Sequence, residues 1–180
     1  MRKLVFSFMR CNPPTKGHNE VIKQVYDLAA ANGDENLIVL SRSHDNKKNP
    51  LTPDSKLHYM KHFWPHVNFE LADTSLPSIV HYIRHLAHSY DGITVVAGKD
   101  RRDEYINLFK NYNAREFYFR WWNVVEAGDS DTRDAISSTQ MRAWAKDEEF
   151  VPFFFGSPKR SEDDTTEVIK MYNDVRKNLA

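Results

Sequence analysis

The sequence predicts an α/β fold of the doubly wound type, in which helices cover both faces of a parallel sheet. Short apolar runs typical of buried strands alternate with amphipathic segments at helical spacing. Several of these runs are apolar on both faces, as strands are when helices cover both sides of a sheet. The length of 180 residues suits one domain. We therefore expect a single domain with its core in residues 1–156 and a C-terminal helical segment at 157–180.

Each element follows from a local pattern. Strands are indicated by runs rich in β-branched and aromatic residues, and helices by apolar residues three or four positions apart. Turn signals separate them, such as Asn32-Gly33 at a helix end and Thr52-Pro53 at a helix start. The expected strands are 3–9, 36–40, 67–71, 93–97 and part of 117–127. The expected helices are 18–31, one from 52, 75–89, a short one at 105–109, 138–146 and one from 166.

Charge and cysteine content narrow the classes of function. Lys plus Arg and Asp plus Glu are 25 each, so no overall field draws the protein towards nucleic acid or an anionic membrane. Cys11 is the single cysteine, and no apolar run approaches the length needed to span a bilayer. No signal-peptide pattern follows Met1. We expect a cytoplasmic protein without disulfides and without nucleic acid or membrane partners.

Ligands of open parallel sheets bind outside the carboxyl ends of the strands. The segments expected there are 9–18, 41–56, 97–103 and 127–142. In the first, "NPPTKGH", prolines stiffen the strand exit, Gly17 permits a close backbone approach, and His18 stands at a helix start that favours an anion. A phosphate there would also meet the Thr15 hydroxyl and Lys16. Alone, this segment suits a capped turn with an incidental histidine equally well.

The fourth segment, "AISSTQMR", shifts the balance towards phosphate binding. Ser137, Ser138 and Thr139 begin a helix, and Arg142 follows one turn after Ser138, so that hydroxyls, free N–H groups and a guanidinium can face one polyphosphate. A Ser-Ser-Thr helix start alone is usually only a cap. Two anion-ready helix starts at one sheet edge exceed what capping requires.

These two segments resemble the T/HxGH and ISSTxxR signatures of the nucleotidyltransferase superfamily, the cytidylyltransferase-like group. That group includes nicotinamide-nucleotide adenylyltransferases, phosphopantetheine adenylyltransferase and FAD synthetases. The stretches "LSRSHDNKKNPLTPDSK", "VVAGKDR" and "VVEAGDSDTRDAISSTQMRA" also resemble compact members carried by tailed bacteriophages, which would place the protein in a host cytoplasm. The resemblance covers about residues 3–156. It implies a Rossmann-like fold and Mg²⁺-assisted transfer of a nucleoside monophosphate from an NTP to a phosphate-bearing acceptor, with release of pyrophosphate.

The resemblance also implies roles for individual residues. His18 would stabilise the α-phosphate, and Thr15 stands where many relatives have a first histidine. Arg142, with Ser138 and Thr139, would hold the β- and γ-phosphates. The residues expected to act in the transfer are Thr15, Lys16, His18 and Arg142; those expected to bind the nucleotide are Met9, Arg10, Gly17, Gly98, Asp100, Ser137, Ser138 and Thr139. Relatives commonly have a glycine and an aromatic residue in the stretch Met9-Arg10-Cys11, so the acceptor side of the pocket is expected to differ here.

The expected reaction moves AMP from ATP to NMN, because Ile-Ser-Ser-Thr resembles the adenylyl branch more than the cytidylyl branch. The alternatives are a cytidylyltransferase acting on an alcohol phosphate, an adenylyltransferase with a phosphopantetheine or FMN acceptor, and a non-catalytic nucleotide- or RNA-binding module. The transfer would be an in-line displacement without a protein nucleophile. The sequence has no carboxylate cluster for a metal, so Mg²⁺ would be held mainly by the nucleotide phosphates.

Other signals have plainer interpretations. Lys47, Lys48 and Lys56 are candidates for further phosphate contacts, although a solvated loop lysine is the plainer interpretation of each. The pairs His58/His62 and His81/His85 are read as surface or boundary histidines, because no third metal ligand accompanies them. The aromatic run around Trp121-Trp122 is read mainly as packing, although stacking on a substrate ring stays open. The run 150–156, "FVPFFFG", is expected to be core or a contact between copies of the chain.

Overall fold

The computed structural model describes residues 1–76, 78–127 and 136–180. Five strands form one sheet in the order β3-β2-β1-β4-β5. Their bounds are Lys3–Met9 (β1), Glu35–Leu40 (β2), Phe69–Leu71 (β3), Gly92–Ala97 (β4) and Trp121–Glu126 (β5). β4 runs parallel to β1, with Lys3 opposite Gly92, and parallel to β5, with Gly92 opposite Trp121. The chain builds outward from β1 first on one side and then on the other, which confirms the doubly wound α/β fold.

The helices follow the strands as the sequence pattern predicts, with two differences. Their bounds are Asn19–Asn32 (α1), Pro53–Phe63 (α2), Ile79–Ala87 (α3), Lys99–Tyr112 (α4), Ser138–Lys146 (α5), Phe150–Gly156 (α6) and Thr165–Asn178 (α7), with short 3-10 turns at Lys16–His18 (η1) and Glu162–Asp164 (η2). α4 is a helix of fourteen residues, whereas the sequence predicts only a short one at 105–109. The sequence underestimates it because only three of its side chains are buried and its charged first turns show no apolar period. The run 150–156 is itself helical.

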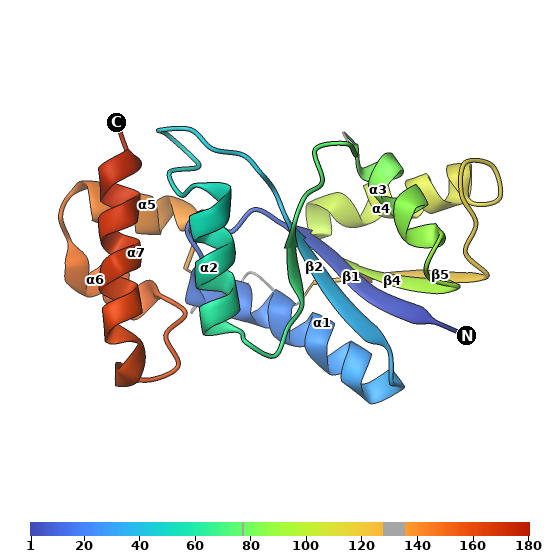
Figure 1. Cartoon of the computed structure of the whole chain (residues 1–180), viewed down its shortest axis with the longest axis horizontal. Coiled ribbons are helices and arrows are strands. Elements are labelled where there is room, and N and C mark those ends of the chain that lie inside the picture. The colour runs from blue at the N-terminus through green and yellow to red at the C-terminus, as the bar shows by residue number, and fades with distance from the viewer. Residues whose placement is uncertain (77, 128–135) are drawn as a thin grey trace. The chain divides into compact units, whose positions relative to one another are not determined.

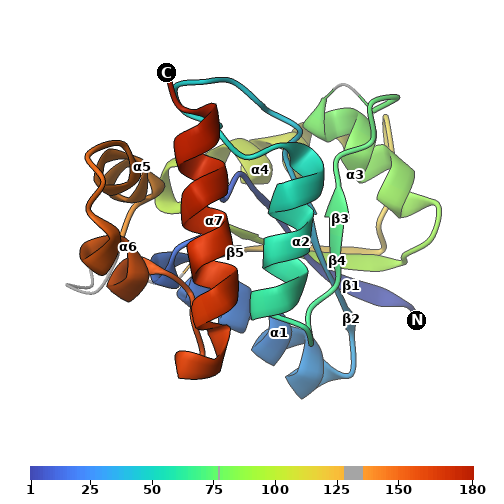
Figure 2. The same ribbon diagram turned by 60° about the vertical axis from the view of Figure 1, so that its left-hand side comes forward.

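The chain divides into two units built from discontinuous segments. The first comprises residues 1–8, 20–39 and 72–128. Its strands have α1 on one face and α3 and α4 on the other (Figure 1, Figure 2). The core on the latter face includes Phe6, which stacks on Tyr82 at 6.2 Å between ring centroids, and Phe109, which stacks on Trp122 at 5.1 Å. Trp122 therefore packs in this core, as aromatic residues of an α/β sheet commonly do.

The second unit comprises residues 9–19, 40–71 and 129–180. Within it α5, α6 and α7 pack on one another, and α2 packs on β3. Polar contacts from α2 hold the C-terminal segment. The Tyr59 hydroxyl donates to Asp174 at 2.5 Å, His58 lies 3.0 Å from Glu167, and His62 lies 2.9 Å from Asp164.

The His58/His62 pair is therefore occupied by acidic partners of this unit, in line with its reading as boundary histidines. No helix in the described parts of the chain is long and apolar enough to cross a membrane.

Candidate functional site

The site lies in the second unit, where the loop after β1 meets the start of α5. Three hydrogen bonds join these segments. The Thr15 hydroxyl donates to the carbonyl of Ile136 at 2.6 Å, and the Ser138 hydroxyl donates to the carbonyl of Pro13 at 2.8 Å. Arg142 Nη1 donates to the carbonyl of Asn12 at 2.8 Å. The two sequence signatures, more than a hundred residues apart, thus form one surface.

The turn before α1 is shaped by Thr15 and Gly17. Thr15 caps η1, and its hydroxyl accepts from the Gly17 N–H at 3.1 Å. A Cβ added at Gly17 would lie 2.8 Å from the Ile136 oxygen and 3.0 Å from its nitrogen. The neighbour that Gly17 admits in this structure is therefore the backbone of the α5 segment.

His18 is held in one tautomer. Its Nδ1 lies 2.9 Å from the Thr15 backbone nitrogen, which can only donate, so Nδ1 accepts and the ring proton resides on Nε2. Burial lowers the pKa of His18 from its ordinary 6.5 to about 4, because the charged imidazolium would lose solvation. At neutral pH, His18 therefore offers a neutral Nε2–H donor.

The α5 start places Arg142 beside this loop. Ser137 and Gln140 form a capping box, in which the Ser137 hydroxyl accepts from the Gln140 N–H at 3.1 Å and the Ser137 N–H donates to the Gln140 side chain at 2.9 Å. Arg142 Nη2 donates to the Thr139 hydroxyl at 3.1 Å. A guanidinium has five N–H donors, so these bonds leave three hydrogens for an anion.

Burial and two charged neighbours act on Arg142. Burial lowers the pKa of Arg142, and repulsion from Arg10 lowers it further, while Asp45 opposes the shift. An arginine stays protonated under such conditions, so Arg142 keeps its positive charge for an anion. The Asp45 carboxylate meanwhile accepts from the backbone N–H groups of residues 47–49 and from the Asn49 side chain. These bonds order residues 45–49 of the loop between β2 and α2.

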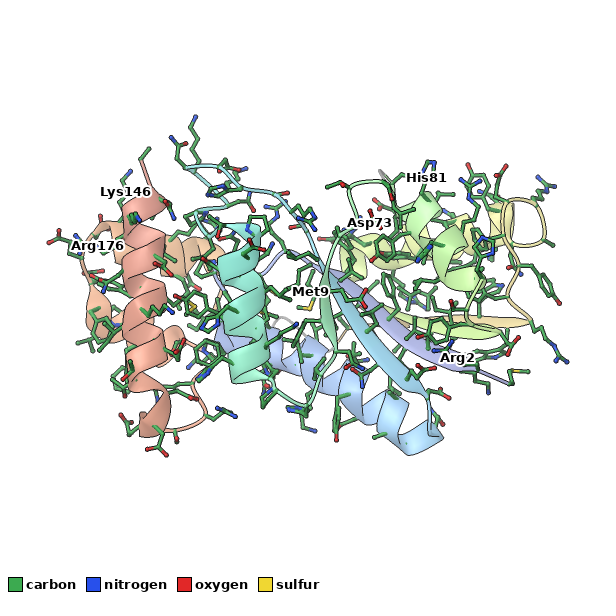
Figure 3. All side chains as sticks on the ribbon, viewed as in Figure 1. Arg2, Met9, Asp73, His81, Lys146 and Arg176 are labelled. Atoms are coloured by element: carbon green, nitrogen blue, oxygen red, sulfur yellow. The ribbon has the colours of Figure 1, made fainter. Side chains whose placement is uncertain are left out.

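The polar loop after β2, residues 41–52, is hydrogen-bonded to the loop after β1. The Ser41 N–H donates to the Met9 carbonyl at 3.0 Å. The side chain of Asn12 pairs with Leu51, accepting from its N–H at 2.8 Å and donating to its carbonyl at 3.1 Å. The half-buried Met9 side chain is marked in Figure 3. Hydrogen bonds at Ser41 and at Leu51 therefore hold both ends of the polar loop.

Lys56 corrects the sequence interpretation. We expected a solvated loop lysine, but Lys56 lies on α2, is 0% exposed, and donates from Nζ to the Ser41 carbonyl at 2.5 Å. Burial lowers the pKa of Lys56 to about 8. The signal was present: Lys56, Met60 and Phe63 fall at i, i+4 and i+7, the spacing of one buried helical face. Lys47 and Lys48 are exposed, as expected.

The remaining predicted site residues are distributed as follows. Arg10 and Lys16 are exposed in the loop after β1, and Thr139 is exposed in the first turn of α5. Gly98 and Asp100 belong to the first unit, where Gly98 is the N-cap of α4 and Asp100 stands in its first turn. Sequence reasoning missed Asn12 as a polar residue of the site, because it was read only as part of a stiff turn.

Across residues 1–76, 78–127 and 136–180, no group of three or more His, Cys, Asp or Glu side chains is arranged to hold a metal ion.

Solved structures share the fold of this chain at low sequence identity. The crystal structure of a bifunctional NMN adenylyltransferase/ADP ribose pyrophosphatase from Francisella tularensis matches with a TM-score of 0.66 and 15% identity, covering 98% of this chain and 53% of that one. A structure of such a protein from the same organism, complexed with AMP and a manganese ion, matches with a TM-score of 0.62 and 13% identity, covering 98% and 52%.

Thermotoga maritima TmcAL bound with alpha-thio ATP matches with a TM-score of 0.57 and 10% identity, covering 93% of this chain and 55% of that one. The chain therefore spans about half the length of these proteins, and the likeness establishes the fold. No protein-family model matches the sequence, and no curated protein matches it.

Proposed function

We propose that the chain is a nucleotidyltransferase that moves AMP from ATP to a phosphate-bearing acceptor, with NMN as the acceptor and NAD and pyrophosphate as products. The observation that carries this proposal is the joining of the two signature segments by three hydrogen bonds, with His18 on one and Arg142 on the other. The similarity in fold to an NMN adenylyltransferase and to proteins bound to AMP and alpha-thio ATP supports the choice of nucleotide.

His18 and Arg142 supply donors suited to the transfer. A phosphate oxygen of the acceptor would attack the α-phosphorus in line with the departing pyrophosphate, and no covalent enzyme intermediate is required. The neutral Nε2–H of His18 would donate to an α-phosphate oxygen, where negative charge changes during the reaction. The three remaining guanidinium hydrogens of Arg142 would bind the β- and γ-phosphates, whose charge grows as pyrophosphate leaves.

A divalent cation fits this site through the nucleotide. The described residues offer no dedicated set of acidic ligands, whereas a triphosphate supplies several oxygens to one Mg²⁺. When bound, the cation would neutralise part of the phosphate charge. A fold neighbour complexed with AMP and a manganese ion is consistent with divalent metal use.

The direct test is product formation with a panel of nucleotides and acceptors. Purified protein with Mg²⁺ is incubated with each NTP and with NMN, FMN, phosphopantetheine or an alcohol phosphate, and pyrophosphate and the dinucleotide product are measured. We expect NAD from ATP and NMN. Turnover of CTP without ATP would replace the proposal with cytidylyl transfer, and nucleotide binding without any turnover would indicate a non-catalytic module.

Two variants test the residues assigned to the reaction. His18→Ala is expected to lower kcat about 100-fold or more, by analogy with loss of one preorganised donor to a transition-state oxyanion. His88→Ala is the matched control, because His88 is an exposed histidine of the first unit. Equal activity of the two variants would remove His18 from the mechanism.

A further inference from the structure

Asn12 makes more long-range hydrogen bonds than a turn residue requires. Its side chain is 0% exposed and pairs in both directions with the backbone of Leu51, at 2.8 Å and 3.1 Å. Its backbone carbonyl accepts from Arg142 Nη1 at 2.8 Å. One residue thus contacts both the polar loop after β2 and the guanidinium of the α5 segment.

The two sets of bonds act on the same peptide. The side-chain amide of Asn12 is held in one orientation, because its N–H donor and its oxygen acceptor both bond to the backbone of Leu51. The fixed residue presents its carbonyl to Arg142, and this bond orients the guanidinium plane. A guanidinium is planar, so this bond and the bond from Nη2 to the Thr139 hydroxyl together set the direction of its remaining hydrogens.

We propose that Asn12 is a positioning residue that links the polar loop to Arg142, so that the Leu51 pairing determines how Arg142 meets the polyphosphate. This inference rests on the proposed function, in which Arg142 binds the β- and γ-phosphates. Asn12 itself would touch no substrate. Its removal should therefore weaken ATP use through Arg142 and not through a contact of its own.

The chain offers a matched control for a purely structural role. Asn113, in the first unit, makes the same two-way pairing with the backbone of Phe119, at 2.9 Å and 3.3 Å. Asn113→Ala therefore removes the same kind of interaction in the other unit of the chain. If Asn12 merely supports the fold, the two variants should lose similar stability and leave ATP affinity unchanged.

The test is a double-mutant cycle on ATP affinity and on kcat/KM for ATP, with Asn12→Ala, Arg142→Ala and the double variant. We expect Asn12→Ala to weaken ATP use about 10- to 100-fold in the presence of Arg142 and less than twofold in the Arg142→Ala background. Hydrogen exchange at the Leu51 amide should accelerate in Asn12→Ala, and Asn113→Ala should leave ATP affinity within twofold of the parent. Asn12→Ser serves if Asn12→Ala does not fold.

Additive losses in the cycle, or loss of ATP affinity in Asn113→Ala equal to that in Asn12→Ala, would overturn the positioning role while the nucleotidyltransferase proposal stood. A parent protein that neither binds nor turns over any NTP would overturn both. The first outcome appears only in the variants and the second appears in the parent, so the two failures are distinguishable.

Discussion

Replacing Gly17 by alanine tests whether the contact between the two signature segments is as close as the structure has it. The added Cβ would lie 2.8 Å from the Ile136 oxygen, 3.0 Å from its nitrogen and 3.3 Å from the Thr15 hydroxyl oxygen. Ordinary van der Waals contact begins near 3.4 Å. Because two of the three opposing atoms are backbone, the α5 segment itself must move.

The size of the effect follows from the overlap. Relieving contacts of 2.8 and 3.0 Å to 3.4 Å requires a displacement of roughly half an ångström, and overpacking of this kind costs about 1–3 kcal/mol. The same displacement lengthens the 2.6 Å bond from the Thr15 hydroxyl to Ile136 and shifts Arg142 relative to His18. For a chain of this size, each kcal/mol lowers Tm by about 2–4 °C. We therefore expect a fall of about 2–12 °C.

Gly98→Ala provides the control for stability. Among the described residues, no atom other than those of its chain neighbours lies within 4 Å of a Cβ at Gly98, and its φ is −60°. The reduced freedom of the unfolded chain favours alanine by about 0.4–1 kcal/mol, while the N-cap position disfavours it by a few tenths. Chemical and thermal unfolding of both variants, with the KM for ATP of Gly17→Ala, measures the difference. A Gly17→Ala protein with the stability and the KM of its parent would refute the reasoning.

Three further predictions concern ionisable groups. An NMR titration of the free protein should give His18 a pKa of about 4, below its ordinary 6.5. The contribution of the neutral His18 to the free energy of unfolding is therefore complete above pH 6.5 and is lost as the pH falls towards 4. A midpoint near 6.5 would contradict the burial of His18. Between pH 8 and pH 10.5, the free energy of unfolding of the parent should rise by about 1–3 kcal/mol relative to that of Lys56→Met. The reason is that over this window Lys56 carries its proton in the unfolded chain but not in the folded one. Parallel curves of stability against pH for the two proteins would contradict this. Tyr59→Phe should lower the free energy of unfolding by about 1–3 kcal/mol, since it removes a donor to the Asp174 carboxylate, and urea unfolding that matches the parent would show that water replaces the bond.

The sequence predicted the order of the elements well because each carried its own local signal. Thr52 and Pro53 stand at the N-cap and first position of α2, and Asn32-Gly33 ends α1 with Gly33 at φ +68°. The failures also have local causes. α4 buries three side chains in fourteen residues, so its pattern resembled that of a polar loop, and the run 150–156 has too little polar contrast to reveal a helical period.

The site was only partly predictable. Residue types at a sheet edge indicated which side chains could meet an anion, and the two segments do lie together. What the sequence does not contain is how those side chains are already used. The Ser138 hydroxyl donates to Pro13 and the Thr15 hydroxyl donates to Ile136, so both hold the segments to each other. Such hydroxyl bonds depend on contacts between residues far apart in the chain, so no periodic pattern in the sequence reveals them.

These contacts give the two segments a structural role. Thr15 and Ser138 join the segments, so NPPTKGH and ISSTQMR constrain each other before any ligand binds. In the proposed function, the donors left for the ligand are His18 Nε2, the remaining Arg142 hydrogens and the exposed groups around them. Preorganised donors stabilise charge better than mobile ones, because they need no reorientation during the reaction. Thr15→Val should therefore impair catalysis by loosening the geometry between His18 and Arg142, and it should lower stability as well, whereas loss of a simple phosphate contact would weaken ATP binding at unchanged stability.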